Sequence, residues 1–204
     1  DGTESGTVMV KNIRSGTGDS YPNHLTAVGS TLYFEANDGT NGDELWKSDG
    51  TASGTVMVKD IYSGSFSSGP AHLTAVGNTL YFRANDGTNG YELWKSDGTA
   101  SGTVMVKDIY SGSGGSSPGY LAAIGNTLYF SATDGTNGAE LWKSDGTASG
   151  TVMVKDINSG GGSSLVYLTA VGNTLYFRAD DGTNGVELWK SDGTESGTVM
   201  VKNL

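Results

Sequence analysis

The chain has 204 residues, a formal charge of -10 at pH 7 and no cysteine. Without cysteine, no disulfide, zinc-thiolate site or cysteine nucleophile can form. The acidic balance argues against nucleic acid as a partner, because such binding requires clustered Lys and Arg that neutralise phosphates. The longest unbroken apolar stretch, near residues 120–124, is far shorter than the roughly 20 residues that span a bilayer, so we expect no membrane insertion.

One structural unit is copied along the chain. Alignment at the DGT openings gives repeat units 1–48, 49–96, 97–144 and 145–191, and residues 192–204 then repeat the opening segment. Periods of this length are typical of propellers and solenoids. We interpret 1–204 as a single domain, with 192–204 a repeated outer strand for ring closure. Because residue 1 is Asp and no secretory signal stands near it, we expect a processed or trimmed chain.

Four short apolar runs follow one another in the second unit, at residues 55–61, 72–77, 79–84 and 91–96. They are rich in β-branched and aromatic residues and are separated by Asn-Gly, Asp-Gly and Ser-Gly pairs, while no segment shows helical apolar spacing. The sequence therefore predicts an all-β chain.

The centres of these runs are apolar on consecutive residues, and consecutive residues of a strand point to opposite faces of the sheet. Both faces are then covered, as in a β-propeller of four-stranded antiparallel blades. We expect 72–77, 79–84, 91–96 and a copy of 55–61 to run from the inner to the outer strand, with 62–71 crossing between blades. Four blades per chain form a closed four-bladed ring or half of an eight-bladed ring, unless the chain is a fragment of a longer array. A β-solenoid is the alternative architecture.

The stretch ELWKSDGT occurs once in every unit, one residue after a DGTNG segment. This pattern resembles the bacterial ELWxxDGT-repeat family, and the resemblance covers essentially the whole chain. It implies a β-propeller in an extracellular or cell-surface protein, and it carries no catalytic residues over to this sequence. The near-identity of the units also suggests recent amplification or an engineered array.

Two residue types recur with a structural interpretation. An aromatic side chain buries up to about 250 Å², so we expect the tryptophan of each unit in the core between blades, with a sugar-stacking platform as the alternative. The aspartate of each SDGT segment should accept backbone N–H bonds in a hairpin where glycine supplies positive φ. The residues with these structural roles are Trp46, Trp94, Trp142 and Trp189, and Asp49, Asp97, Asp145 and Asp192.

The DGTNG loops are rich in oxygen ligands, which suggests calcium. The EF-hand register fails because Ser96 stands where a bidentate Glu is required. A different cage formed by Asp86, Asn89 and Glu92 is the alternative. No cofactor other than calcium is expected. The candidate metal ligands are Asp38, Asp86, Asp134, Asp181, Glu44, Glu92, Glu140 and Glu187.

Differences among the units fall mostly on one face of the predicted ring, where the crossings and the DGTNG loops meet. Repeat proteins generally bind through variable loops on one face of a rigid scaffold, although neutral drift in solvated loops gives the same pattern. Histidines and tyrosines share one repeat position, and no nucleophile or acid accompanies them at informative spacing. The candidate ligand-binding residues are His24, His72, Tyr120, Tyr167, Tyr62, Tyr110, Arg83, Arg178 and Tyr91.

The sequence therefore favours a non-enzymatic scaffold for extracellular recognition or adhesion, with an unknown protein or glycan ligand. The second hypothesis is a carbohydrate-binding, lectin-like module, either dependent on calcium or independent of it. The third is an amplified or engineered propeller with no ligand. In each case we expect a monomer or a homodimer formed through ring closure.

Overall fold

The computed structural model describes residues 2–203, and strands are the only regular elements found there. No helix in this range is long and apolar enough to cross a membrane. The strands are β1 (Asn23–Val28), β2 (Thr31–Asn37), β3 (Asp43–Ser48), β4 (Val56–Lys59), β5 (Ala71–Val76), β6 (Thr79–Asn85), β7 (Tyr91–Ser96), β8 (Val104–Lys107), β9 (Gly119–Ile124), β10 (Thr127–Thr133), β11 (Ala139–Ser144), β12 (Val152–Lys155), β13 (Val166–Val171), β14 (Thr174–Asp180), β15 (Val186–Ser191) and β16 (Val199–Lys202).

Each group of four consecutive strands forms one antiparallel sheet. We call these sheets blade 1 (β1–β4), blade 2 (β5–β8), blade 3 (β9–β12) and blade 4 (β13–β16), each running from an inner to an outer strand. The all-β prediction and the predicted strand order are confirmed. The alternative of a β-solenoid is wrong, because the strands pair within groups of four consecutive strands and not from one turn to the next.

The outer strand is shorter than the sequence predicts. In blade 1 it covers Val56–Lys59 and not 55–61, because the chain leaves the sheet beyond Lys59. The backbone N–H of Ile61 donates to Glu44 Oε2 at 3.0 Å and no longer to a neighbouring strand. The first copy of this segment, residues 8–12, forms no strand at all.

Successive blades pack face to face through one repeated core. We call the face of a blade that contacts the following blade its trailing face, and the face that contacts the preceding blade its leading face. Between blades 1 and 2 the trailing face contributes Val28, Tyr33, Leu45, Val58 and Ile61, and the leading face contributes Leu80, Phe82, Ala84 and Trp94. The same sets recur between blades 2 and 3 and between blades 3 and 4.

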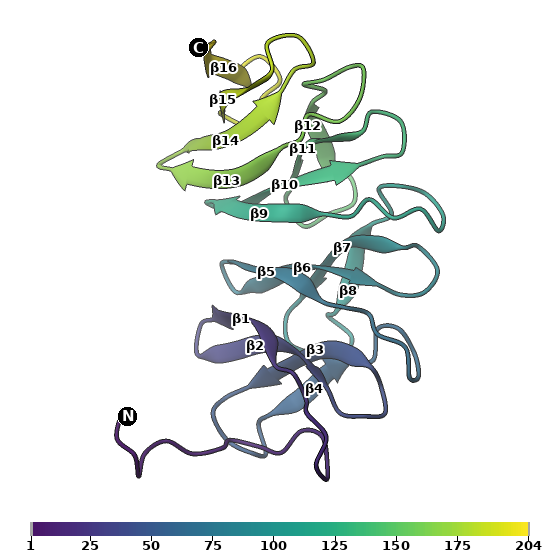
Figure 1. Cartoon of the computed structure of the whole chain (residues 1–204), viewed down its shortest axis with the longest axis vertical. Helices are drawn as coiled ribbons and strands as arrows, with labels where there is room; N and C mark the ends of the chain where they lie inside the picture. The colour runs from purple at the N-terminus through teal and green to yellow at the C-terminus, as the bar shows by residue number, and fades with distance from the viewer. Residues whose placement is uncertain (1, 204) are drawn as a thin grey trace.

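The four blades form an open arc. Their inner strands make contact in succession, from β1 to β5, β5 to β9 and β9 to β13. Within residues 2–203 no comparable contact joins β13 to β1, and blades 1 and 4 lie at opposite ends of the molecule (Figure 1). A single chain therefore leaves one trailing face and one leading face without a neighbouring blade.

Candidate functional site: an aromatic row on the inner strands

One position near the start of every inner strand has a left-handed backbone. The φ angles are 55° at His24, 57° at His72, 53° at Tyr120 and 59° at Tyr167. Each inner strand carries one extra residue at this point relative to the strand beside it. Such a bulge bends the strand and redirects a side chain. The same bulge therefore places four aromatic side chains in equivalent positions on four successive blades.

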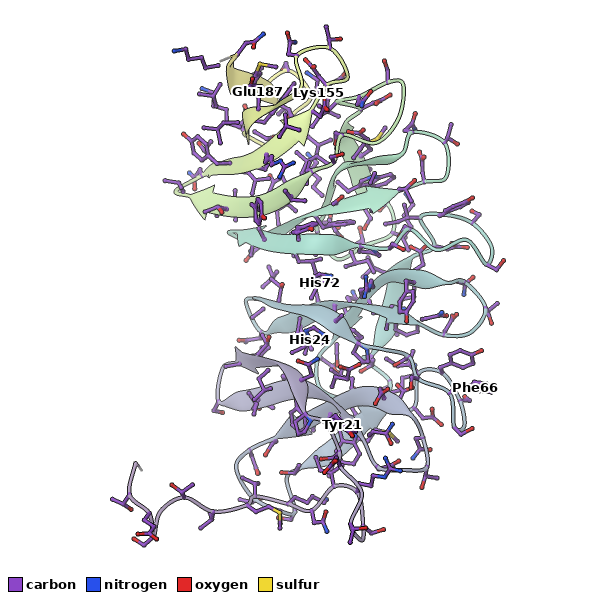
Figure 2. The ribbon with its side chains drawn as sticks, viewed as in Figure 1. Tyr21, His24, Phe66, His72, Lys155 and Glu187 are labelled. Atoms are coloured by element: carbon purple, nitrogen blue, oxygen red, sulfur yellow. The ribbon has the colours of Figure 1, made fainter. Side chains whose placement is uncertain are left out.

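These side chains form a row, which we call the aromatic row. The His72 and Tyr120 ring centroids lie 6.3 Å apart, and those of Tyr120 and Tyr167 lie 6.4 Å apart with an edge-on orientation. Figure 2 shows His24 and His72 on consecutive inner strands. Tyr120 is 44% exposed and Tyr167 is 70% exposed. The row thus offers polar aromatic rings to solvent along the inner side of the arc.

Charged groups lie next to the row in blades 1 and 2. The guanidinium carbon of Arg83 lies 4.8 Å from the ring centroid of Tyr91. Burial lowers the pKa of His72, and the nearby side chains of Arg83 and His24 lower it further. Burial raises the pKa of Glu35, and Arg83 opposes that shift. This end of the row therefore combines aromatic surface with a cation and a carboxyl group.

Two other variable residues, the tyrosines of the crossings, lie against the loops of the following blades. Tyr62 packs on the loop of blade 2 at Gly87, and Tyr110 packs on the loop of blade 3 at Gly135, leaving no room for a side chain at either glycine. Tyr62 also stacks on Phe66, with ring centroids 4.8 Å apart. These tyrosines support the loops, and no described ring contact joins them to the aromatic row. Arg178 occupies on β14 the position that Arg83 occupies on β6, and its side chain is exposed.

The glutamate of the ELW motif anchors the crossing between blades. Glu92 is fully buried and accepts hydrogen bonds from the backbone N–H groups of Ile109 at 3.1 Å, Tyr110 at 3.2 Å and Ser116 at 2.8 Å, and from the Ser116 hydroxyl. Burial raises the pKa of Glu92, although these donors oppose the shift. The carboxyl group thus fixes where the crossing leaves the outer strand and where it returns.

The equivalent glutamates are fully buried only in the blades that are followed by a crossing. Glu44 and Glu140 are also fully buried, and burial raises the pKa of each to about 7. Glu187 in blade 4 is only partly buried. The sequence offered a signal for this role, because a serine is kept in every otherwise variable crossing. These serines are Ser20, Ser68, Ser116 and Ser163.

The aspartates of the DGTNG loops bind their own loops. Asp86 Oδ1 accepts from the backbone N–H groups of Thr88 at 2.8 Å and Asn89 at 2.9 Å, and Oδ2 accepts from Asn89 Nδ2 at 2.8 Å. Burial opposes ionisation, yet these bonds hold the pKa of Asp86 below its usual value. The same bonds recur at Asp38, Asp134 and Asp181.

The candidate calcium ligands therefore have separate partners. The aspartates bind loop amides, while the buried glutamates bind the crossings. Across residues 2–203 no group of three or more His, Asp or Glu side chains is arranged to hold a metal ion. The calcium site stays a prediction from the sequence, without geometric support in this structure.

Tryptophans and hairpin aspartates lie away from the row. Trp94 is 6% exposed in the core between blades 1 and 2, with Lys59 Nζ 5.7 Å from its ring centroid. Asp97 Oδ1 accepts from the backbone N–H and the hydroxyl of Thr99 in the hairpin to the outer strand. Trp142 and Trp189 have the same environment, whereas Trp46, which has no preceding blade, is buried in a smaller cluster with Phe34 and Ala36. The equivalent aspartates Asp49, Asp145 and Asp192 accept the same two bonds.

Comparison with solved structures identifies the architecture. A puromycin hydrolase matches with a TM-score of 0.57 and 14% identity over 89% of this chain and 29% of that chain. A Mycobacterium tuberculosis puromycin-hydrolyzing peptidase gives 0.58 and 11% over 91% and 29%, and a putative TolB from Agrobacterium tumefaciens gives 0.50 and 13% over 86% and 62%. The chain is a β-propeller.

At this identity the similarity concerns the fold alone. The propeller chain spans less than a third of either hydrolase chain and less than two thirds of the TolB chain. No family model matches the chain, and a search of curated proteins finds no sequence relative. Function must therefore be inferred from the site itself.

The aromatic row is suited to binding. Rings that are partly exposed, with hydroxyl or imidazole groups at their edges, combine apolar contact with hydrogen bonding. In the described residues no hydrogen bond joins the imidazole of His24 or His72 to a Ser, Asp or Glu side chain. The arrangement needed for a base-activated nucleophile is thus not assembled around these histidines.

Proposed function

We propose that this propeller is a non-enzymatic scaffold for extracellular recognition or adhesion, and that the aromatic row is its binding surface. The observation that carries the proposal is the repeated left-handed bulge, which presents an aromatic side chain at the same point of every blade. For bulky residues this conformation costs of order 1–3 kcal/mol, and such strain is concentrated at functional sites. The ELWxxDGT-type repeat supports a secreted or surface-exposed protein of that family.

The rigidity of the blades supports recognition. Glu44, Glu92 and Glu140 fix the crossings, and the hairpin aspartates fix the opposite face. A fixed backbone holds the row without ordering cost when a ligand binds. Sequence differences among the units then alter the chemistry of the row while the scaffold stays constant.

A glycan is the ligand class that the exposed rings favour. Tyr120 and Tyr167 present accessible ring surface and hydroxyl groups side by side. The apolar face of a sugar ring can lie on an aromatic ring while its hydroxyl groups bind neighbouring polar atoms. Arg83 and Glu35 would extend such polar contacts at the other end of the row. Under this candidate the propeller is a lectin-like module.

A glycan array probed with labelled protein, with and without calcium, tests the proposal. We expect binding to one glycan class that is lost in Tyr167→Ala and retained in Phe66→Ala. Phe66 is a matched control because it is 59% exposed and lies at the outer edge of the molecule, away from the row (Figure 2).

Binding that survives Tyr120→Ala and Tyr167→Ala together would place the ligand elsewhere on the propeller. Binding that disappears on calcium removal would revive the cation-dependent module. If the folded protein binds no glycan on the array, with or without calcium, the result would favour a repeat propeller without a glycan ligand.

A further inference from the structure

The three junctions between blades repeat one set of polar contacts besides the apolar core. Lys47 Nζ donates to the carbonyl of Gly98 at 2.8 Å, and Lys95 and Lys143 make the equivalent bonds to Gly146 and Gly193. A tyrosine of the trailing face lies against the same glycine in each case. These contacts define what a complete junction looks like in this protein.

Within the described residues, the trailing face of blade 4 has the apolar side chains of a junction and no blade against it. Leu188 is 51% exposed, whereas Leu45, Leu93 and Leu141 at the same position are fully buried. Val201 is 45% exposed. At the equivalent position Val58, Val106 and Val154 are 6–7% exposed. The face is therefore built as a junction core and is open to solvent.

The leading face of blade 1 is the complementary half. Leu32 is partly exposed, although Leu80, Leu128 and Leu175 at the same position are fully buried. An apolar hollow of about 180 Å³ opens beside Leu32 and Phe34. Gly50, which should receive the lysine and tyrosine of a preceding blade, has no side chain within 4 Å of where its Cβ would stand.

The segment before blade 1 marks the place of a missing outer strand. Lys11 Nζ donates to the carbonyl of Thr55 at 2.7 Å, just as Lys59 Nζ of β4 donates to that of Thr103 at 2.8 Å. Residues 8–12 thus lie where the outer strand of a preceding blade belongs. Val8 and Met9 are 73% and 78% exposed, and this segment pairs with no described strand.

We propose that two copies of this chain close one eight-bladed ring, with the trailing face of each blade 4 on the leading face of the other copy's blade 1. Faces that differ but fit one another form a closed ring when the rotation permits it. Propellers typically have four to eight blades. One copy forms an open arc and does not close, and three copies exceed the range of four to eight blades. Two copies can both close the ring and stay within that range.

The internal junctions specify the contacts of this interface. Leu188 and Val201 of one copy cover Leu32 and the apolar hollow beside it on the other, and Lys190 reaches the carbonyl of Gly50. The outer strand of that junction comes from β16 or from residues 8–12 of the other copy, because 192–203 and 1–12 have the same sequence. The closed ring brings together two aromatic rows, whatever ligand they bind.

Light scattering on the full chain after size exclusion tests this directly. We expect about 42 kDa, twice the 21.0 kDa of one chain, over a broad range of protein concentration. A mass of one chain at every concentration would overturn the proposal. So would a mass that grows with concentration beyond two chains, because open ends would then join into filaments.

A matched pair of variants locates the interface. Leu188→Asp places a carboxylate on the trailing face and should reduce the mass to that of one chain. Val199→Asp should leave the dimer intact, because Val199 is 38% exposed and its equivalents Val56, Val104 and Val152 are 37–38% exposed even inside the array. Circular dichroism should show the same strand content for both. A folded Leu188→Asp protein that remains a dimer would refute the assigned interface.

Discussion

Blade 2 and blade 4 have nearly the same sequence and different surroundings. Blade 2 has a neighbour on each side, whereas blade 4 has one. Leu93 is therefore fully buried, and Leu188, in an identical ELWKSDGT segment, is 51% exposed. The repeat thus specifies the blade and both of its faces, while the adjacent blade decides whether a face is core or surface. Matched substitutions in the two blades measure that difference.

The largest effect is expected from removing the leucine of the trailing face. Leu93→Ala leaves a cavity between blades 2 and 3 and should lower the free energy of unfolding by about 2–5 kcal/mol at every protein concentration. Leu188→Ala leaves no internal cavity in a single chain. Its cost should appear as weaker association of two chains and should vanish on dilution. Denaturant titrations at several concentrations distinguish the two, and equal, concentration-independent losses would contradict the difference between the blades.

The buried glutamate provides the next comparison. Glu92→Gln turns an amide N–H₂ toward backbone N–H donors of the crossing, so at least one buried donor loses its acceptor. Leaving such a group unsatisfied costs about 1–3 kcal/mol. Glu187→Gln is the control, because Glu187 is only partly buried and should cost less in a single chain. Urea unfolding of both variants gives the comparison, and a larger loss in the Glu187 variant would contradict the anchoring role.

The same burial predicts a pH dependence. The pKa of Glu44 is about 7 in the folded chain, above its ordinary value near 4.5. The folded state therefore holds a proton that the unfolded state has lost between these values. Relative to Glu44→Gln, the unfolding free energy of the parent protein should rise as the pH falls from about 8 to about 5. Urea titrations across this range test the sign, and a parent protein that loses stability relative to the variant would contradict it.

Strand order and type could be predicted because glycine-containing turns separate the four strands of each blade and the strands carry apolar residues on both faces. The third strand, 91–96, was predicted to the residue. The outer strand was predicted too long, because the apolar pattern continues to Ile61 while the backbone already turns toward Glu44. A periodic pattern shows which residues are apolar and not which backbone groups leave the sheet.

The candidate site could be predicted only in part. The shared repeat position of His24, His72, Tyr120 and Tyr167 was visible in the sequence, but their left-handed backbone was not, because none of them is glycine. The glutamates of the ELW motif were interpreted as calcium ligands because the sequence shows oxygen atoms without showing their partners. Their donors lie 17 to 24 residues away in the next crossing.

The hairpin aspartates should show a smaller effect that is the same in both blades. Asp97 and Asp192 accept hydrogen bonds from their own hairpin threonines, which lower the pKa of each, and a lysine of the preceding blade lowers it further, so both aspartates have the same surroundings. Asp97→Ala and Asp192→Ala should each lower the melting temperature slightly, and less than Glu92→Gln does. Thermal unfolding followed by circular dichroism provides the measurement. A clearly larger loss for Asp97 would show that the blade that follows blade 2 also contributes to the stability of this hairpin.

The smallest difference is expected at the lysine of the outer strand. Lys107 Nζ lies 5.9 Å from the ring centroid of Trp142 in the next blade and donates to the carbonyl of Thr151 at 2.9 Å. Lys107→Met keeps most of the aliphatic stem and removes the charge, which should cost about 0.5–1 kcal/mol. Lys202→Met should cost nothing in a single chain, because no following blade supplies a tryptophan. In a two-copy ring whose closing junction takes its outer strand from β16, Trp46 of the other chain takes that place, so Lys202→Met should weaken the dimer by a similar amount. Dissociation measured by dilution would then show the same interaction across the closing junction that Lys107 makes within the chain.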